Sequence, residues 1–307
     1  MRVSMYPALD VGESEVCCMK LTTLQQEGHE QAAIVTANGG VLLETVNRAT
    51  GSCWSLTVTE LLEKEELAEL TAWYAGGGAA TIAGLAAIPP AQMTYAPLLR
   101  KPPKIWGIGA NYREKAVEMA VTPPDGEPIC FMKPTTTLIG PGEAIVLPIG
   151  VERVTAEAEI AIVIGKRCKH VAERDALGVI AGFTPSLDMT AQDIHARNPR
   201  FLGRSKSFDT FFSFGPELVT PDECPAAADW PVETWLNGTL AFSTDVSRMI
   251  YTIPYIVSFF SQLMTLEPGD IIMTGTPGSV RLAPGDTAEC RIGGGFAVLR
   301  NPVVAEV

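Results

Sequence analysis

Short alternating stretches of apolar and polar residues open the chain and predict a small unit over residues 1–95. The apolar runs Ala33–Ala37 and Val41–Thr45 flank Asn38-Gly39-Gly40, a β-hairpin signal because asparagine and glycine tolerate the positive φ of a tight turn. A capping box that begins at Thr57 predicts a helix that continues to about Tyr74 and ends at the glycines that follow. The uncharged stretch of Ala, Gly, Pro and Thr beyond them is predicted to be a loop or linker rather than a membrane span.

From Lys104 onward the pattern changes to short strands separated by Pro-Gly turns, which predicts a second, β-rich unit over residues 96–307. Proline followed by glycine suits the two central positions of a type II turn. One amphipathic helix interrupts the strands, because apolar residues recur on one face from Ile253 to Leu263. The predicted strands are Ala158–Ile164, Val232–Asn237, Ile271–Thr274, Thr287–Ile292 and Ala297–Val304. This pattern predicts an α+β, β-rich fold with a rolled sheet.

Composition and charge exclude several classes of protein. The 307 residues are 47% hydrophobic and 19% charged, which supplies a core and excludes disordered and fibrous chains. A net charge of −12 without Lys/Arg runs argues against nucleic acid and anionic membranes as partners. No apolar run of signal-peptide length precedes Asp10, so we expect a cytoplasmic protein. Seven scattered cysteines and three histidines argue against a zinc or multi-histidine site and favour free thiols.

Three acidic residues are the candidates for a metal site. Glu157 and Glu159 lie two apart at the start of a predicted strand, so both carboxylates point to one face. The strand continues as an apolar run, which favours burial, and buried acids need a metal ion or a base. Asp188 follows the apolar run Val179–Phe183, a second predicted strand. Three carboxylates favour Mg²⁺, with Mn²⁺ or Ca²⁺ as alternatives. A solvated strand edge is the other interpretation of the Glu-x-Glu pattern.

The segment from Lys104 to Val304 resembles the fumarylacetoacetate hydrolase superfamily, and residues 1–95 look like the small accessory domain of its bacterial members. The motifs that carry the resemblance are KIWGIGANY (104–112), FMKP (131–134), AEAEIAIVIGK (156–166), GFTPSLDMTAQD (182–193), GRSKSFDTFFSFGP (203–216), WLNG (235–238) and LEPGDIIMTGTP (266–277). The resemblance implies a catalytic domain of mixed β-rolls and a homodimer. It also implies a divalent metal on Glu157, Glu159 and Asp188, and a 2-oxo or 1,3-dicarbonyl acid that is cleaved at a carbon–carbon bond.

The resemblance assigns roles to two further residues. Lys206 in GRSKSFD matches the family's active-site lysine, whose ammonium binds substrate oxygens. Thr276 in the Thr-Gly-Thr-Pro motif matches the threonine that contacts the substrate carboxylate. Without the family, Lys206 would be interpreted as a surface lysine and Thr276 as a turn residue.

The lid region departs from the family pattern. Members that hydrolyse their substrate carry a histidine, followed three residues later by a glutamate, on a lid helix that activates water. This chain has Lys115 in place of the histidine and keeps the acid as Glu118. A lysine that is charged at neutral pH cannot take a proton from water, but it can act as a general acid toward an enolate. The other interpretation is a solvated helix face with a Lys-Glu pair at i, i+3.

Two further departures concern substrate contacts. The family usually has Arg and Gln four and seven residues after the metal-binding aspartate, whereas this chain has Gln192 and His195. A positive clamp for a substrate anion is therefore lost, unless His195 supplies it when protonated or acts instead as the base. Phe242 stands where a polar glutamine is common, which predicts a more apolar substrate pocket.

These observations leave three hypotheses. The first is metal-dependent hydrolytic cleavage of a carbon–carbon bond in a 2-oxo or 1,3-dicarbonyl acid, with Lys206, Lys115, Glu118 and His195 as the catalytic candidates. The second is a metal-dependent lyase, a decarboxylase or hydratase/dehydratase, in which the metal is the electron sink and Lys115 returns the proton. The third is a non-catalytic scaffold that kept the fold.

Overall fold

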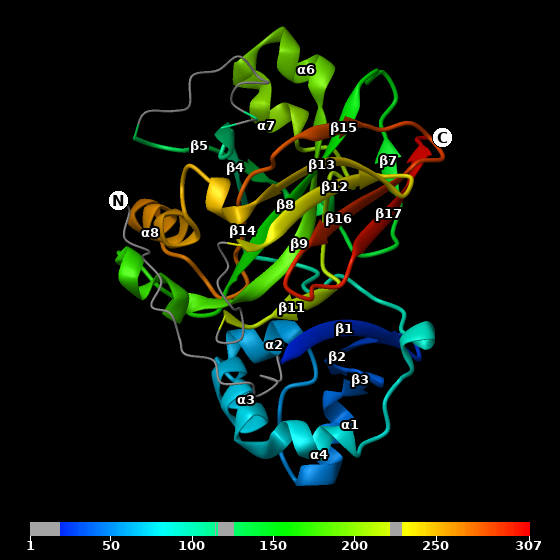
Figure 1. Cartoon of the computed structure of the whole chain (residues 1–307), viewed down its shortest axis with the longest axis vertical. Helices are drawn as coiled ribbons and strands as arrows, with labels where there is room; N and C mark the ends of the chain where they lie inside the picture. Colours follow the sequence, from blue (N-terminus) through cyan, green and yellow to red (C-terminus); the bar gives the residue numbers. More distant parts are fainter. Residues whose placement is uncertain (1–18, 114, 116–125, 222–228) are drawn as a thin grey trace.

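The computed structural model describes residues 19–113, 115, 126–221 and 229–307 and shows a β-rich α+β fold (Figure 1). Within these residues the strands form two sheets. The larger contains β1 (Lys20–Gln26), β2 (His29–Thr36), β3 (Gly39–Leu42), β4 (Ile105–Gly109), β5 (Ile129–Lys133), β6 (Leu138–Ile139), β8 (Val154–Ile164), β9 (Ile180–Ala191), β10 (Phe212–Phe214), β11 (Glu217–Val219), β14 (Ile271–Met273) and β15 (Ser279–Arg281). The smaller contains β7 (Ile145–Leu147), β12 (Pro231–Leu236), β13 (Thr239–Asp245), β16 (Thr287–Ile292) and β17 (Leu299–Ala305). The predicted fold class is confirmed.

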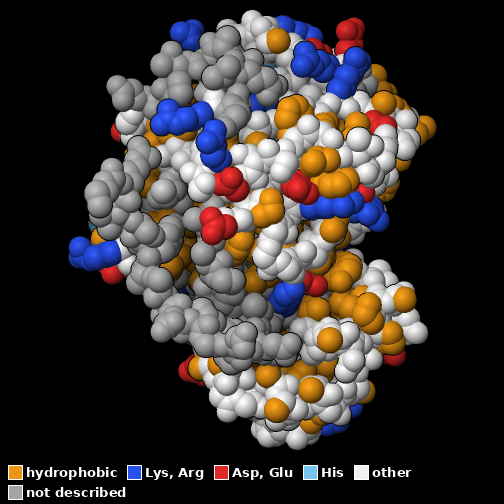
Figure 2. All heavy atoms as spheres, in the orientation of Figure 1, with side chains coloured by type: hydrophobic (Ala, Val, Ile, Leu, Met, Phe, Trp, Pro, Cys, Tyr) orange, Lys and Arg blue, Asp and Glu red, His pale blue; other side chains and the backbone are white. Residues whose placement is uncertain are grey.

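The helices are short and lie outside the sheets (Figure 1). They are α1 (Leu43–Thr50), α2 (Val58–Glu63), α3 (Leu67–Trp73), α4 (Ala79–Ala83), α6 (Gln192–Arg197), α7 (Leu202–Ser205) and α8 (Ile253–Leu263). Helix α8 has the predicted bounds, because the Thr252 hydroxyl caps it by accepting the Tyr255 N–H at 3.4 Å. None of the helices in the described ranges combines the length and the apolar character that crossing a bilayer requires. Acidic, basic and apolar side chains are mixed on the face that Figure 2 shows.

The N-terminal unit contains the predicted hairpin, with one strand shorter than expected. Strands β2 and β3 pair antiparallel around a turn at Ala37 and Asn38, which confirms the hairpin, with Gly39 already in β3. The second strand was expected to reach Thr45, but it ends at Leu42 and helix α1 follows. The physical reason is burial: Leu43 and Val46 are three apart on one face of α1 and both are buried.

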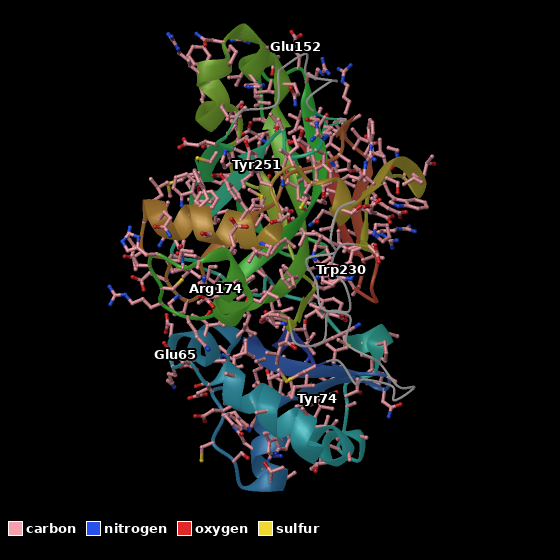
Figure 3. All side chains as sticks on the ribbon, turned by 60° about the vertical axis from the view of Figure 1, so that its left-hand side comes forward. Glu65, Tyr74, Glu152, Arg174, Trp230 and Tyr251 are labelled. Carbon is pink, nitrogen blue, oxygen red and sulfur yellow. The ribbon has the colours of Figure 1, made fainter. Side chains whose placement is uncertain are left out.

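The predicted helix over residues 57–74 is divided in two. Its cap is confirmed, because the Thr57 hydroxyl accepts the Glu60 N–H at 3.2 Å. The chain breaks between α2 and α3, where Glu65 adopts a left-handed φ of 57°. The glycines do not end the helical segment that α3 begins, because Tyr74–Gly78 forms a π-helical turn that leads into α4. Part of the predicted loop is therefore helical, and Tyr74 is buried inside this unit (Figure 3).

The N-terminal strands continue the large sheet of the rest of the chain. Strand β1 pairs antiparallel with β11, so the order β3-β2-β1-β11-β9-β8 is one hydrogen-bonded path. Leu21 and Ile34 of this unit belong to the same buried cluster as Ile105 and Val163 of the larger unit. The unit occupies the lower end of Figure 1. We keep the division into domains of residues 1–95 and 96–307 as a proposal.

Strands β8 and β9 are buried along their whole length and position the site. Every residue from Val154 to Ile164 and from Ile180 to Ala191 is buried. Even-numbered residues of β8 such as Ile160 pack toward the small sheet and α8, whereas Ala161 belongs to the cluster shared with the N-terminal unit. The predicted strand over residues 179–183 is the beginning of β9, which continues past Asp188. The other predicted strands correspond to β8, β12, β14, β16 and β17.

A buried carboxylate on the small sheet gives a stability prediction. Glu289 is 3% exposed and accepts hydrogen bonds from Arg291 at 2.7 Å and Arg300 at 3.1 Å. Burial alone would raise the pKa of Glu289, but these bonds outweigh it and lower the pKa. We expect E289Q to lose about 1 kcal/mol in denaturant unfolding at pH 7, because both arginines are partly exposed.

The pH dependence of that loss follows from the lowered pKa. A carboxyl whose pKa is lower in the folded than in the unfolded protein stabilises the fold at any pH above its unfolded pKa of about 4.3. This contribution is lost as the pH falls through the folded pKa. The difference between parent and E289Q should therefore shrink below about pH 4. The control is E44Q, whose exposed pair with Arg48 is expected to contribute less than about 0.5 kcal/mol. An equal loss of stability in E289Q and E44Q would contradict the stabilising role of the buried Glu289 carboxylate.

Candidate metal centre

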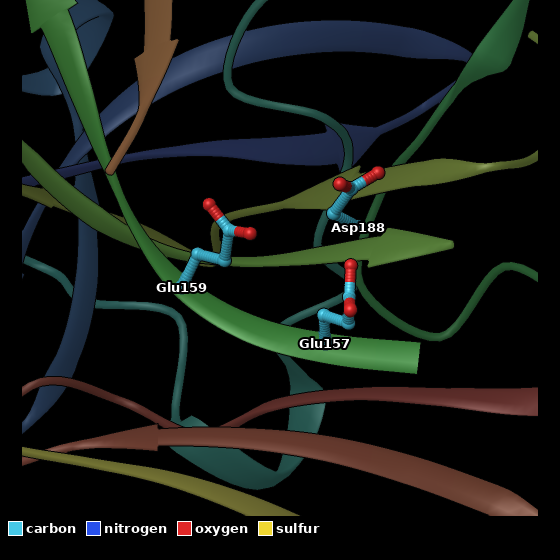
Figure 4. Close-up of side chains that lie close together, drawn as sticks. All are labelled: Glu157, Glu159 and Asp188. Carbon is cyan, nitrogen blue, oxygen red and sulfur yellow. The ribbon is translucent and has the colours of Figure 1, made fainter. Parts of the chain in front are cut away.

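The three predicted acids meet at the middle of the β8–β9 pair. Glu157 pairs directly with Asp188 across the two antiparallel strands, and Glu159 lies two residues further along β8. One carboxylate oxygen from each residue lies within 4.8 Å of the other two (Figure 4). Their exposures are 5%, 2% and 0%, so the alternative of a solvated strand edge does not hold. Three clustered, dehydrated oxygen donors are the ligand type that hard divalent cations prefer.

Two buried lysines contact Asp188. Lys206 follows α7, and its Nζ donates to both Asp188 and Glu157, the latter at 3.1 Å. Lys133 at the end of β5 donates to the other Asp188 oxygen at 2.6 Å. Burial lowers the pKa of Lys133 to about 8 even though Asp188 opposes the shift. Sequence reasoning missed Lys133; the available signal was a lysine within FMKP, a motif quoted only for the family resemblance.

Lys115 also reaches the acids, although much of the lid lies outside the described residues. Its Nζ donates to the Ser279 hydroxyl at 2.9 Å and lies 3.5 Å from Glu157 Oε1. Lys115 is 4% exposed, so the interpretation as a solvated helix face is wrong for this side chain. Glu118, the predicted lid acid, falls outside the described residues.

The charge of Glu159 is the least compensated in the cluster. Within the described residues it forms no ion pair, and its Oε2 accepts the Gly275 N–H at 2.6 Å. Burial, followed by the charges of Asp188 and Glu157, raises its pKa well above the ordinary value. A divalent cation among the three carboxylates would relieve this repulsion. The donor set therefore fits the ion that the family implies.

A buried asparagine holds the loop that contacts Glu159. The Asn111 amide donates to the carbonyl oxygens of Thr274 at 2.7 Å and Tyr251 at 3.1 Å, and it accepts the Tyr251 N–H. Gly275 has a φ of 94°, and an added Cβ would lie 2.8 Å from the Asn111 Cβ. Only glycine fits this close approach, which directs its N–H at Glu159.

A cavity of about 440 Å³ opens onto Glu157 and Glu159. Among the described residues it is lined by predicted and unpredicted side chains: Lys115, Arg153, Glu157, Glu159, Thr190, Gln192, His195, Lys206, Thr276 and Ser279 on the polar side, with Ile108, Ile129, Phe131, Pro199 and Leu202 among the apolar ones. The volume is within the range of small-ligand sites. Arg153 was not anticipated from the sequence.

The predicted substrate contacts are only partly in this cavity. Gln192 and Thr276 line it, and the Thr276 hydroxyl donates to the Gly278 carbonyl at 2.8 Å. Burial, followed by the charge of Lys206, lowers the pKa of His195, which favours its neutral form. Phe242 is not in the cavity wall: it is exposed on β13, and its ring lies against Gly278. The expected apolar contribution comes from β4, β5 and the segment around α7 instead.

Residues 104–304, about two thirds of the chain, match the family described as fumarylacetoacetate (FAA) hydrolase C-terminal. The chain belongs to the fumarylacetoacetate hydrolase family, as the sequence motifs predicted. The fold, with its N-terminal region, is shared over most of the chain by solved structures of this type. Its relatives include tautomerases, isomerases and hydrolases.

Three relatives illustrate that range. The chain is 34% identical over 244 residues to the mitochondrial oxaloacetate tautomerase Fahd2a of Rattus norvegicus, covering 77% of this chain and 76% of the relative. It is 28% identical, with a TM-score of 0.76, to maleylpyruvate hydrolase from Sphingobium sp. SYK-6 in complex with manganese(II) and pyruvate. The match covers 94% of this chain and 100% of the hydrolase chain. It is 29% identical, with a TM-score of 0.70, to 2-hydroxyhepta-2,4-diene-1,7-dioate isomerase from Mycobacterium marinum. The match covers 94% of this chain and 99% of the isomerase chain.

Proposed function

We propose that this chain is a divalent-metal-dependent tautomerase of a 2-oxo dicarboxylic acid of the oxaloacetate type. The observation that carries the proposal is the buried ammonium of Lys115, held 2.9 Å from Ser279 and 3.5 Å from Glu157 at the cavity wall. A lysine there is suited to give a proton to carbon, not to activate water. The likeness to the rat oxaloacetate tautomerase supports the same assignment.

In this proposal Glu157, Glu159 and Asp188 hold the ion, Mg²⁺ or Mn²⁺. When bound, the ion supplies Lewis-acid stabilisation of the charge that develops on the substrate's 2-oxo oxygen. Lys133 and Lys206 orient the Asp188 carboxylate through their hydrogen bonds. These five side chains are at most 5% exposed, so the acids meet water only through the cavity.

The remaining residues move the proton. In ketonisation the enol hydroxyl loses a proton and C3 gains one, so no water is consumed and no carbon–carbon bond breaks. Lys115 holds the proton for C3 on Nζ. His195, favoured in its neutral form by its lowered pKa, is positioned in the cavity wall to accept the hydroxyl proton at a ring nitrogen. Lys206, to which the family motif assigns a contact with substrate oxygens, lines the cavity and donates to Glu157, Asp188 and Thr190.

Hydrolytic carbon–carbon cleavage is the second candidate. It is supported by the likeness to maleylpyruvate hydrolase over 94% of this chain, and neutral His195 would then be the base that activates water. A decarboxylase would use the same metal site with Lys115 as the acid. A scaffold role has little support, because a cluster of buried charges is costly for folding and has no use without a ligand.

The discriminating experiment uses the full chain loaded with Mg²⁺ or Mn²⁺. We expect it to accelerate the loss of enol-oxaloacetate absorbance by at least about 100-fold over buffer, the lower end of general acid–base catalysis. Solvent deuterium should enter C3 at the same rate, without release of CO₂ above the metal-only blank. Chelator-treated protein is the control. Formation of CO₂ faster than enol loss would support the lyase instead of the tautomerase. Cleavage of an acylpyruvate without turnover of the enol would support the hydrolase.

A further inference from the structure

One face of the β8–β9 pair forms a continuous polar track that leads away from the acids. Side chains two residues apart on a strand share a face, and directly paired residues of antiparallel strands share it too. The track consists of the pairs Glu159 with Ser186, Glu157 with Asp188 and Thr155 with Thr190, followed by Arg153 next to Gln192. Arg153 and Gln192 are held side by side by a backbone hydrogen bond, in which the Gln192 N–H donates to the Arg153 carbonyl at 2.8 Å. The acids thus lie at one end of the track and an arginine at the other.

Arg153 lies at the cavity mouth with its charge available. It directly follows Glu152, which Figure 3 labels near α6. Arg153 is exposed, lines the same cavity as Glu157, and forms no ion pair within the described residues. Four residues separate it from Glu157, or about 13 Å along an extended strand. An extended arginine side chain and a short dicarboxylate together can bridge this span.

The other cations of the cavity are committed to the acids. Lys115 and Lys206 pair with Glu157, and Lys206 also pairs with Asp188. His195 is favoured in its neutral form by burial and by the charge of Lys206, so it does not replace the arginine that the family usually has at position 192. The apolar side chains of the lining, such as Ile108 and Leu202, offer no charge to a carboxylate. Arg153 is therefore the cation in this cavity wall that remains for a distal anion.

We propose that Arg153 binds the distal carboxylate of the substrate and selects 2-oxo dicarboxylic acids over 2-oxo monocarboxylic acids. The inference rests on the proposed function, whose metal and Lys115 engage the other end of the molecule. A planar guanidinium binds a carboxylate through two parallel hydrogen bonds, a geometry that lysine cannot reproduce. Gln192, the first residue of α6, supports the contact, because its side-chain amide donates to the Thr155 hydroxyl at 3.2 Å. Arg153, which directly precedes β8, thus takes the place of the arginine that the family usually has at position 192.

The test compares two probes of equal chain length that differ in the distal carboxylate, 2-oxoglutarate and 2-oxopentanoate. Binding to the Mg²⁺-loaded full chain is measured by calorimetry for the parent, R153M and R153K. We expect the parent to bind 2-oxoglutarate more tightly, and R153M to weaken that binding roughly 10- to 100-fold without changing the affinity for 2-oxopentanoate or Mg²⁺. R153K should restore part of the loss. The matched control is R197M, which removes an exposed arginine of α6 that is not in the described cavity lining.

Kinetics provide a second readout. R153M should raise KM for enol-oxaloacetate with a much smaller change in kcat, because Arg153 contacts the C4 carboxylate in both the bound substrate and the transition state and takes no part in the proton transfer. Equal weakening of both probes, no weakening of either, or a parent that does not prefer the dicarboxylate would overturn the role of Arg153. Arg153-dependent binding in a protein that does not ketonise enol-oxaloacetate would support the clamp and overturn only the tautomerase.

Discussion

E159Q is expected to lose at least about 1,000-fold in metal-dependent activity, the size of effect that several kcal/mol of Lewis-acid stabilisation implies. The metal-free variant should nevertheless be as stable as the parent or more stable. Glu159 contributes a charge that the described residues leave unpaired, and the amide oxygen of glutamine can still accept the Gly275 N–H. Metal content after dialysis against Mg²⁺ or Mn²⁺, and unfolding with and without chelator, measure the two effects.

The stability effect of E159Q also has a predicted pH dependence. The pKa of Glu159 is raised in the folded metal-free protein, so the unfolded chain releases this proton first, above about pH 4.3. The carboxyl therefore favours folding below that pH, and its contribution declines as the pH rises toward the folded pKa. Glutamine does not titrate, so the free energy of unfolding of E159Q should rise relative to that of the metal-free parent as the pH increases.

D188N is the matched control for E159Q. It removes the shared partner of Lys133 and Lys206, two buried ammonium groups. Breaking a buried pair from one side costs about 3–5 kcal/mol, so D188N should be strongly destabilised even without metal. Both variants should fail to retain the ion. A stable E159Q that still binds metal, or an E159Q as unstable as D188N, would contradict the charge assignment of this cluster.

The elements with strong periodicity could be predicted from the sequence, and those determined by tertiary packing could not. Helix α8 and strand β16 have the predicted bounds, because an apolar face defines the helix and the Pro284-Gly285-Asp286 turn directly precedes the strand. The start of α1 was missed since Val41–Thr45 favours a strand locally, whereas burial of Leu43 and Val46 favours a helix. Likewise, no local signal shows that β1 extends the sheet at β11.

The acids of the site could be predicted from the strand pattern, whereas Lys115 and Lys206 were found only through the family resemblance and Lys133 and Arg153 were missed. Two glutamates at i and i+2 must share a strand face, and this relation needs no tertiary knowledge. Lys133 and Arg153 approach the site only because β5 pairs with β4 and because β8 pairs with β9 in one register. A lysine considered alone is expected at the surface, so the burial of Lys133 and Lys115 had no local signal. Lys206 was found through its family motif.

K115A is expected to lose about 100- to 10,000-fold in kcat for enol-oxaloacetate, the contribution of one positioned general acid. Metal should still bind, and its affinity should stay equal or increase, because the ammonium 3.5 Å from Glu157 repels the ion. Glu157 keeps Lys206 as a partner, so the fold should tolerate the change. Removing the side chain also leaves space at the cavity wall for a small amine.

Rescue by that amine separates proton transfer from a structural role of Lys115. Methylammonium added to K115A should restore part of kcat in proportion to its concentration, and solvent deuterium should again enter C3, because the amine takes the place of the missing Nζ. The matched control is R113A, an exposed neighbour two residues earlier, which should keep full activity and show no response to amine. If K115A retains kcat, or recovers no activity with amine while binding metal and dicarboxylate normally, then Lys115 does not deliver the proton and His195 or the lid must do so.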